Sequence, residues 1–182
     1  MPVAVAPIRV NFGCGDTRLD GFVGVDVRPS RAADYVLPAW DTSPFELDSV
    51  AEIYSRHMLE HLDPAQAYRA LAAWLDILEP GGRLRLIVPD LEFHARQLLG
   101  QQVSWSVDSA RNIEHAMAGF YGWREPRRGG ALEDAHRWGY TWETLTTLLR
   151  EVGYTRIQHV CNGIDSEPWH LHVTALKPIQ ES

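Results

Sequence analysis

Hydrophobic residues along the chain fall into short, nearly continuous runs, which are separated by polar stretches that contain glycine or proline. Runs of this kind are typical of strands in a parallel sheet, because such strands are buried on both faces and show no alternation with polar residues. They predict seven strands, over residues 8–12, 22–27, 33–37, 50–55, 83–88, 156–161 and 170–176.

Two of the intervening segments have helical periodicity and clear ends. The first begins with Asp63 as N-cap and Pro64 as the first helical residue, and it is stopped by a Pro-Gly pair. Gln66, three residues after the cap, completes a capping box. The second helix begins at Thr141 and ends at Gly153, which suits a left-handed C-cap.

Strands that alternate with helices in this order predict an α/β fold: a Rossmann-like, doubly wound, mostly parallel sheet of seven strands with helices on both faces. The last two strands are expected to form a hairpin-like edge. Only residues 16–21 separate the first two strands, whereas a parallel crossover normally takes about a dozen or more residues and contains a helix. The first crossover helix is therefore predicted to be shortened or absent.

We expect a single domain over residues 1–182, since no linker or repeat interrupts the pattern. Residues 100–140 show no sustained period, and we expect them to form an irregular cap over the sheet with one short helix near 111–117. This cap would carry the acceptor pocket, because tryptophan and tyrosine faces suit flat or sugar-like molecules. The aromatic residues of 105–142 are equally compatible with a minor core under a long loop.

Composition and charge limit the classes of partner that we expect this chain to bind. With 17 Lys and Arg against 24 Asp and Glu, the net charge of −7 disfavours nucleic acid, since an acidic surface repels phosphate backbones. No apolar run approaches the roughly 18–20 residues of a membrane helix, and no signal-peptide pattern opens the chain, so we expect no membrane partner. Two cysteines cannot build a disulfide framework, which favours a cytoplasmic location. A homo-oligomer remains open.

The first two strands end in residues suited to a nucleoside. The segment 11–15 reads NFGCG, in which Gly13 and Gly15 allow close backbone approach to a ligand, and Asp26 ends the second strand. Ligands of doubly wound sheets bind at these strand ends, where a carboxylate can accept both ribose hydroxyls. A tight turn beside a surface aspartate is the structural alternative. A dinucleotide fingerprint is disfavoured because Arg18 stands where its third glycine belongs.

Further segments extend this pattern along the chain. They read VGVDV at 23–27, DTSPFELDSVAEIYS at 41–55, HMLEHL at 57–62, LEPGGRLRLIVPD at 78–90 and HRWGYTWETLTTLLREVGY at 136–154. Together with NFGCG, and in this order, they resemble class I S-adenosylmethionine-dependent methyltransferases of the small, type-11-like kind with an LEH signature. The resemblance covers most of the chain except 100–135. It implies S-adenosylmethionine as cofactor and methyl transfer as the activity, and it does not specify the substrate. We expect a small-molecule acceptor, with a saccharide or secondary metabolite as the class.

The resemblance also implies a set of cofactor-binding positions. They are Asn11, Gly13, Cys14, Gly15, Asp26, Val27, Trp40, Asp41, Thr42, Ser55, Arg56 and His57. Within this set Asp26 would bind the ribose hydroxyls, Val27 would pack on the adenine, and Asp41 would cap the adenine amino group, with Asp34 as the alternative acid. Asn11 departs from the family, whose first position usually carries an acid. Cys14 is expected to be a small buried residue and not a nucleophile.

Transfer to an oxygen or nitrogen acceptor needs a base near the departing proton, and histidine suits neutral pH. His57, directly after the fourth strand, is the first candidate for this catalytic role, His136 the second and His94 the third. For each of them, a purely structural hydrogen-bonding role is the alternative.

Two other functions stay open at this point. A degenerate methyltransferase fold that acts as a binding or scaffold protein is favoured by Asn11 and by the short first crossover. A metal hydrolase is suggested by H-x-x-E-H at 57–61, an inverted zinc-protease motif. That chemistry needs His57 and His61 on one helical face, whereas 50–55 reads as a strand, so we expect no metal.

Overall fold

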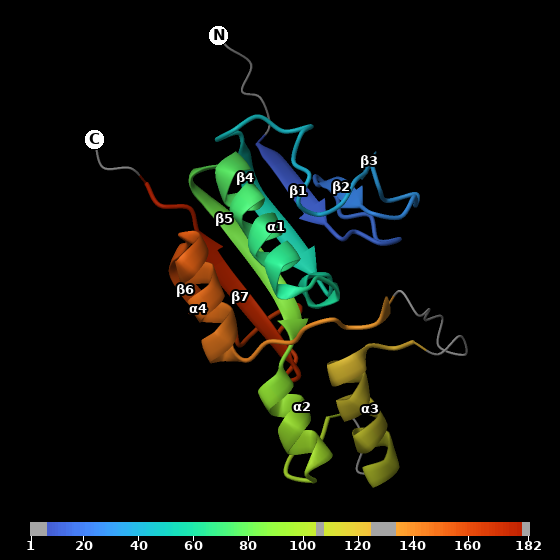
Figure 1. Ribbon diagram of the computed structural model, residues 1–182. Coiled ribbons are helices and arrows are strands. Elements are labelled where there is room, and N and C mark those ends of the chain that lie inside the picture. The colour runs from blue at the N-terminus through green and yellow to red at the C-terminus, as the bar shows by residue number, and fades with distance from the viewer. Residues whose placement is uncertain (1–6, 105–107, 125–133, 180–182) are drawn as a thin grey trace.

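The computed structural model describes residues 7–104, 108–124 and 134–179, and a seven-stranded sheet forms its centre (Figure 1). The strands are β1 (Ile8–Phe12), β2 (Val23–Asp26), β3 (Tyr35–Val36), β4 (Val50–Arg56), β5 (Leu78–Pro89), β6 (Thr155–His159) and β7 (His170–Leu176). Their order across the sheet is β3-β2-β1-β4-β5-β7-β6, and β7 pairs antiparallel with both of its neighbours while the other described pairs are parallel. The predicted Rossmann-like, mostly parallel sheet is confirmed.

Both predicted helices form with the expected ends. The helix α1 (Pro64–Ile77) begins after Asp63, whose side chain accepts from the Gln66 backbone N–H at 2.9 Å. The helix α4 (Trp142–Val152) begins after Thr141 and ends at Gly153, whose φ of 117° places it in the left-handed region. These local signals are strong enough to define both helices without tertiary information.

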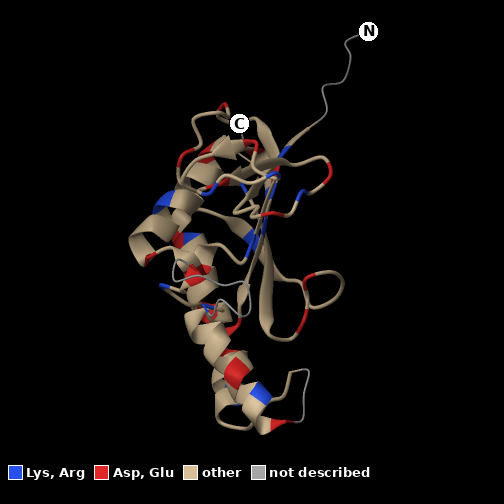
Figure 2. Ribbon diagram, turned by 90° about the vertical axis from the view of Figure 1, so that its right-hand side faces the viewer, with Lys and Arg blue, Asp and Glu red and all other residues tan. Residues whose placement is uncertain are grey.

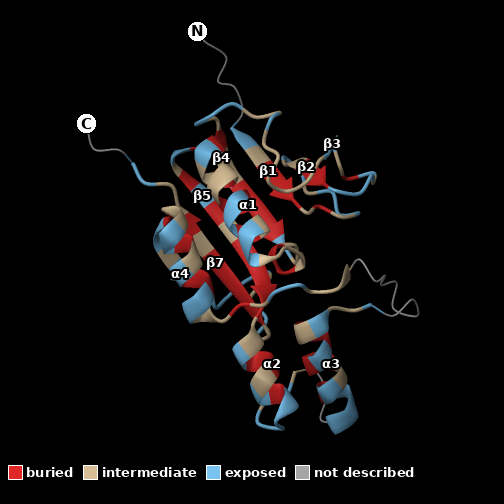
Figure 3. Cartoon of the chain, viewed as in Figure 1, coloured by how far each residue is buried: buried red, intermediate tan, exposed pale blue. Residues whose placement is uncertain are grey.

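Helices α1 and α4 contact each other and lie on the same face of the sheet (Figures 1 and 2). The core lies between them and the strands, as the buried positions in Figure 3 show. Its largest side chain is Trp74 of α1, which stacks on Phe12 of β1 with 4.8 Å between ring centroids. We expected helices on both faces of the sheet. In the described residues, α1 and α4 cover one face and no helix packs on the other.

The opposite face of the sheet is polar, which explains why no described helix packs there. Side chains alternate along strands, so Arg9, Glu52 and Arg85 point away from the core formed by their neighbours. Arg9 forms a 3.0 Å ion pair with Glu52, and the Arg85 guanidinium lies 5.1 Å from the ring centroid of Tyr54. Such a surface offers an amphipathic helix little apolar area to bury.

The first crossover contains no helix between Gly13 and Phe22, as predicted. Strand boundaries differ more. The third strand is only two residues long, whereas 33–37 was predicted. The strand predicted at 83–88 begins at Leu78, because the chain keeps pairing through the Pro-Gly-Gly sequence, where the Gly81 N–H donates to the Lys177 carbonyl at 3.1 Å.

The predicted irregular cap is more helical than expected. A helix α3 (Ser109–Tyr121) is longer than the predicted 111–117, and α2 (Leu91–Leu98) was not predicted. The two pack on each other beyond the carboxyl ends of the strands (Figure 1). Between them Gln97 donates to Asn112 at 2.8 Å and pairs with His115 at 3.0 Å. Because the buried faces of α2 and α3 contain these polar residues, hydrophobic periodicity predicted neither α2 nor the full length of α3.

No helix in the described part of the chain is long and apolar enough to cross a membrane.

Trp74 should dominate the stability of this fold. Trp74→Ala removes a fully buried indole and its 2.7 Å hydrogen bond to the Ala39 carbonyl. We expect the free energy of unfolding to fall by about 3–5 kcal/mol in urea denaturation. Tyr68→Ala, at a 46% exposed position of the same helix, is the matched control and should cost less than about 1 kcal/mol. Equal losses for both variants would contradict the central role of Trp74.

Candidate functional site

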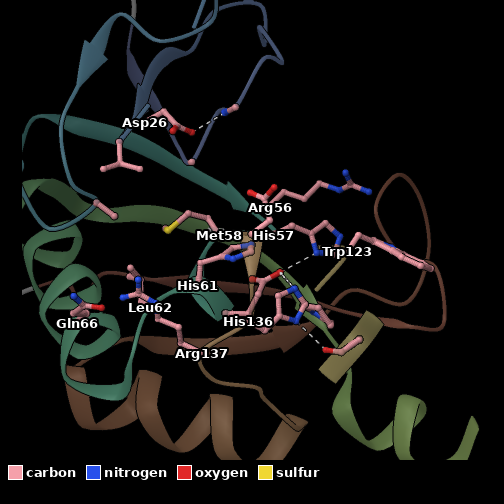
Figure 4. Close-up of a pocket in the computed structure, with 18 of the residues that line it drawn as sticks. Asp26, Arg56, His57, Met58, His61, Leu62, Gln66, Trp123, His136 and Arg137 are labelled. Carbon is pink, nitrogen blue, oxygen red and sulfur yellow. Dashed lines mark hydrogen bonds and ion pairs between the residues drawn. The ribbon is translucent and has the colours of Figure 1, made fainter. Parts of the chain in front are cut away.

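A cavity of about 950 Å³ lies at the carboxyl ends of the parallel strands (Figure 4). The loop after β1, the end of β2, residues 37–40 and the segment after β4 form one part of its lining. The end of α3 and residues 134–137 and 167–170 form the other part. A volume of this size is at the upper end of the range for small-molecule and cofactor pockets.

The glycine loop and Asp26 form a connected unit at this cavity. Gly13 and Gly15 have φ angles of 75° and 52°, which glycine adopts without strain. The Gly15 N–H donates to one oxygen of Asp26 at 2.8 Å, and the Arg28 N–H donates to the other at 2.9 Å. A carboxylate has about four lone-pair sites, so Asp26 keeps acceptor capacity for a ligand.

An apolar wall continues from Asp26 along the cavity. Val27 stands 67% exposed at its rim, and Leu37, Pro38 and Trp40 follow from the segment after β3. The guanidinium of Arg69 lies 5.4 Å from the ring centroid of Trp40, which holds the indole in place. A flat aromatic ligand would fit against this wall.

The structure brings only part of the predicted cofactor set into the lining. Gly13, Gly15, Asp26, Val27, Trp40, Arg56 and His57 line the cavity. Asn11, Cys14, Asp41, Thr42 and Ser55, and the alternative acid Asp34, are not among the lining residues. Both acids are engaged elsewhere in the fold: Asp41 accepts from the Ser43 N–H at 3.1 Å in a local turn, and Asp34 accepts from the Gly24 N–H of β2 at 2.8 Å.

Six of the chain's eight histidines line the cavity: His57, His61, His94, His115, His136 and His170. Sequence reasoning named three of them as candidate bases and noted His61 in a metal motif. It did not anticipate His115 or the gathering itself, because these residues come from the segment after β4, a 3-10 helix, the helices α2 and α3, the segment before α4 and the start of β7. Figure 4 shows His57, His61 and His136 turned toward one region, with Asp26 apart from them.

His57 is held in a chain of hydrogen bonds. Its backbone is left-handed with φ of 51°, and its Nδ1 lies 3.1 Å from the buried carboxylate of Glu60. Its Nε2 lies 3.0 Å from Nε2 of His170, whose Nδ1 lies 3.1 Å from Glu167. These three hydrogen bonds need three protons on the two rings, so one ring is charged when all are made. Burial, together with the nearby His57, lowers the pKa of His170 to about 4, which makes His170 the neutral ring.

Three other histidines are also kept neutral. Burial lowers the pKa of His94 to about 4 and the pKa of His115 to about 4, and it lowers the pKa of His136 as well. The rings of His94 and His115 lie 4.9 Å apart, and Gly119 packs so closely on His94 that an added Cβ would lie 2.2 Å from that ring. His94, the third candidate base, is thus a tightly packed residue.

Of the aromatic stretch 105–142, Trp123 lines the cavity, whereas Tyr121 and Trp138 are about half exposed. Trp105 lies outside the described residues. Trp169, which sequence analysis did not single out, adds a second indole to the lining. The cavity therefore combines aromatic faces with carboxylates and imidazoles.

No protein-family model matches the sequence, and no curated protein matches it at a significant level. Solved structures of S-adenosylmethionine-dependent methyltransferases do match the fold. One from Methanosarcina mazei is 16% identical, with 97% of this chain and 95% of that chain covered and a TM-score of 0.62. One from Mesorhizobium loti is 15% identical, with 93% and 90% covered and a TM-score of 0.56.

A third solved structure contains ligands. The 1,6-didemethyltoxoflavin-N1-methyltransferase of Burkholderia thailandensis, with bound 1,6-didemethyltoxoflavin and S-adenosylhomocysteine, is 15% identical. The alignment covers 94% of this chain and 71% of that one, with a TM-score of 0.58. At such identities the likeness establishes the fold, which is that of class I methyltransferases.

The two cysteines should differ sharply in reactivity. Burial, reinforced by the charge of Asp26, raises the pKa of the Cys14 thiol to about 11, and the side chain is 5% exposed. Cys161 is exposed. At pH 8 iodoacetamide should modify Cys161 within minutes and leave Cys14 unmodified in the folded protein, as read by peptide mass spectrometry. Cys161→Ser should then take up no label, and labelling of Cys14 at a comparable rate would show that the loop opens.

Proposed function

We propose that this chain is an S-adenosylmethionine-dependent methyltransferase that acts on a small molecule. The observation that carries the proposal is the Asp26 carboxylate, which lies at the carboxyl end of β2 beside the glycine loop in a methyltransferase fold. This is the place where open α/β sheets bind the ribose of a nucleoside.

The residues at this place fit such a cofactor. Asp26 retains acceptor sites for ribose hydroxyls, and the space beside Gly15 is open, since an added Cβ would meet nothing within 4 Å. Val27 and Trp40 offer apolar surface for the adenine. When bound, S-adenosylmethionine supplies an electrophilic methyl group. Asp41 and Asp34 do not line the cavity, so we assign neither to the adenine amino group.

The histidine-rich half of the cavity would receive the acceptor. The chain's contribution there is to orient the acceptor, exclude water and take up its proton. His57 and His136 remain our candidates for the last task. With His170 as the neutral ring, His57 donates from both nitrogens, so it must first give up a proton before it can accept one from the acceptor. His136 donates from Nδ1 to the Gly119 carbonyl and keeps its Nε2 lone pair. Trp123 and Trp169 favour a flat or saccharide-like acceptor.

A binding or scaffold protein is the second candidate. The missing crossover helix favours it, as does Asn11, a buried residue whose Oδ1 has no hydrogen-bond partner among the described residues. Asp26 argues against it, because a pocket that no longer bound a nucleoside would not need a carboxylate with free acceptor sites facing the cavity.

Calorimetric titration with S-adenosylmethionine and S-adenosylhomocysteine tests the cofactor, with NAD as the negative control. We expect micromolar binding of the first two ligands and none of NAD. Asp26→Asn and Asp26→Ala should each weaken S-adenosylhomocysteine binding by at least about 30-fold, because hydrogen bonds to a charged partner are lost. Asp41→Asn, an aspartate outside the lining, should leave the affinity unchanged. Thermal unfolding of each variant checks that the fold is retained.

Unchanged affinity in both Asp26 variants would overturn the ribose assignment. Absence of binding to the unaltered protein at millimolar ligand would favour the scaffold function.

A further inference from the structure

Three side chains at the histidine-rich half of the cavity are arranged as a potential ligand set. Glu60, His61 and His136 each offer one ligand atom, and these atoms all lie within 4.8 Å of one another. Glu60 and His61 come from the 3-10 helix η1 (Leu59–His61) after β4, and His136 comes from the segment before α4. The set therefore joins two distant parts of the chain.

Both imidazoles are fixed in the tautomer that a metal requires. His61 Nδ1 lies 3.3 Å from the Ala135 carbonyl, and His136 Nδ1 lies 3.0 Å from the Gly119 carbonyl. A carbonyl only accepts, so each Nδ1 donates and each Nε2 keeps its lone pair. Histidines that bind metals in proteins are oriented by this kind of contact from the other ring nitrogen to a backbone carbonyl.

Glu60 supplies an independent indication of a ligand. Its side chain is fully buried, and its Oε2 has no hydrogen-bond partner among the described residues. Its Oε1 accepts from His57 at 3.1 Å and lies 4.0 Å from Nε2 of His136. A buried anionic oxygen without a partner costs free energy unless a proton donor or a cation reaches it. The position of Glu60 in the cavity lining allows a cation to do so.

We propose that Glu60, His61 and His136 bind a divalent transition-metal ion such as Zn²⁺. Two imidazoles and one carboxylate match the nitrogen and oxygen ligands of such ions and leave further coordination positions open to the cavity. Ligand atoms of a tetrahedral zinc ion lie about 3.4 Å apart. The imidazoles therefore move toward Glu60 by about 1 Å on binding, which is a side-chain rotation.

The site differs from the hydrolase considered from the sequence, which needed His57 and His61 on one helix. Here His57 lies outside the ligand set and holds Glu60 through Oε1. If the proposed function is correct, on which this step rests, the open positions face the acceptor. With the ion bound, Nε2 of His136 is a ligand, so His57 is then the remaining candidate base. A divalent ion favours an acceptor that presents hydroxyl or carboxylate oxygens, and it narrows the expected class toward polyhydroxylated molecules.

Metal binding can be measured without any acceptor. The protein, freed of affinity tag and treated with chelator, is titrated with Zn²⁺ by calorimetry and with Co²⁺ by visible absorption. We expect one ion per chain with a dissociation constant in the micromolar range or below, and a Co²⁺ spectrum of low symmetry. His61→Ala, His136→Ala and Glu60→Gln should each weaken Zn²⁺ binding by at least about 100-fold, since loss of an outer partner alone costs 10–100-fold.

The matched control is His159→Ala, an exposed histidine of β6 outside the cavity, which should bind Zn²⁺ as the unaltered protein does. Glu60 is buried, whereas His61 and His136 are only partly buried, so the two histidine variants decide the result if Glu60→Gln fails to fold. If His61→Ala binds Zn²⁺ as tightly as the control, the proposed site is wrong. It is also wrong if the unaltered protein binds no Zn²⁺ at about 1 mM, a concentration far above a micromolar dissociation constant.

The same variants separate this site from the cofactor. Asp26→Asn should keep full Zn²⁺ affinity, and His61→Ala should keep full S-adenosylhomocysteine affinity. If the protein binds Zn²⁺ but not the cofactor, the metal site is supported and the methyltransferase proposal is rejected. If it binds the cofactor but not Zn²⁺, the methyltransferase proposal is supported and the metal site is rejected.

Discussion

The position of Trp74 between β1 and the segment after β3 sets the geometry of the whole cavity. Its ring stacks on Phe12, the last residue of β1, and its Nε1 donates to the Ala39 carbonyl. Phe12 precedes the glycine loop, and Ala39 belongs to the apolar wall. A single buried side chain of α1 thus places the two surfaces between which a nucleoside would lie, and loss of its packing would move both.

Because no described helix covers the other face of the sheet, the first crossover must be held by other means. Asp26 does this by accepting from Gly15, and Ser30 donates to the Gly15 carbonyl at 2.5 Å. In a fold with a crossover helix, packing of that helix would define the loop. Here the carboxylate proposed to bind the ribose also shapes the loop beside it, so ligand binding and loop conformation share one group.

The sequence was informative where local chemistry determines structure. Caps at Asp63 and Thr141, the glycines of the first loop and the apolar strands all depend on neighbours in the chain, and the structure follows them. Helix α2 was missed because its buried face includes His94 and Gln97, which pair with groups of α3. The gathering of six histidines depends entirely on tertiary contacts between distant segments, for which a single sequence holds no signal.

The electrostatics of the cavity follow from the burial of these histidines. With the pKa of His94, His115 and His170 each near 4, these rings carry no charge at neutral pH, although histidines are the most numerous ionisable groups in the lining. Burial opposes ionisation of Glu60, but the hydrogen bond from His57 and the charge of that ring outweigh it, and the pKa of Glu60 is lowered. Its negative charge is therefore retained at a buried position, where the low dielectric screens it poorly. Such a carboxylate attracts positive charge strongly. The cavity can supply that charge in two ways, as the proton shared along the His57–His170 chain or as a metal ion between His61 and His136. Both use the same carboxylate, so an ion bound between His61 and His136 would weaken the hydrogen bond between Glu60 and His57.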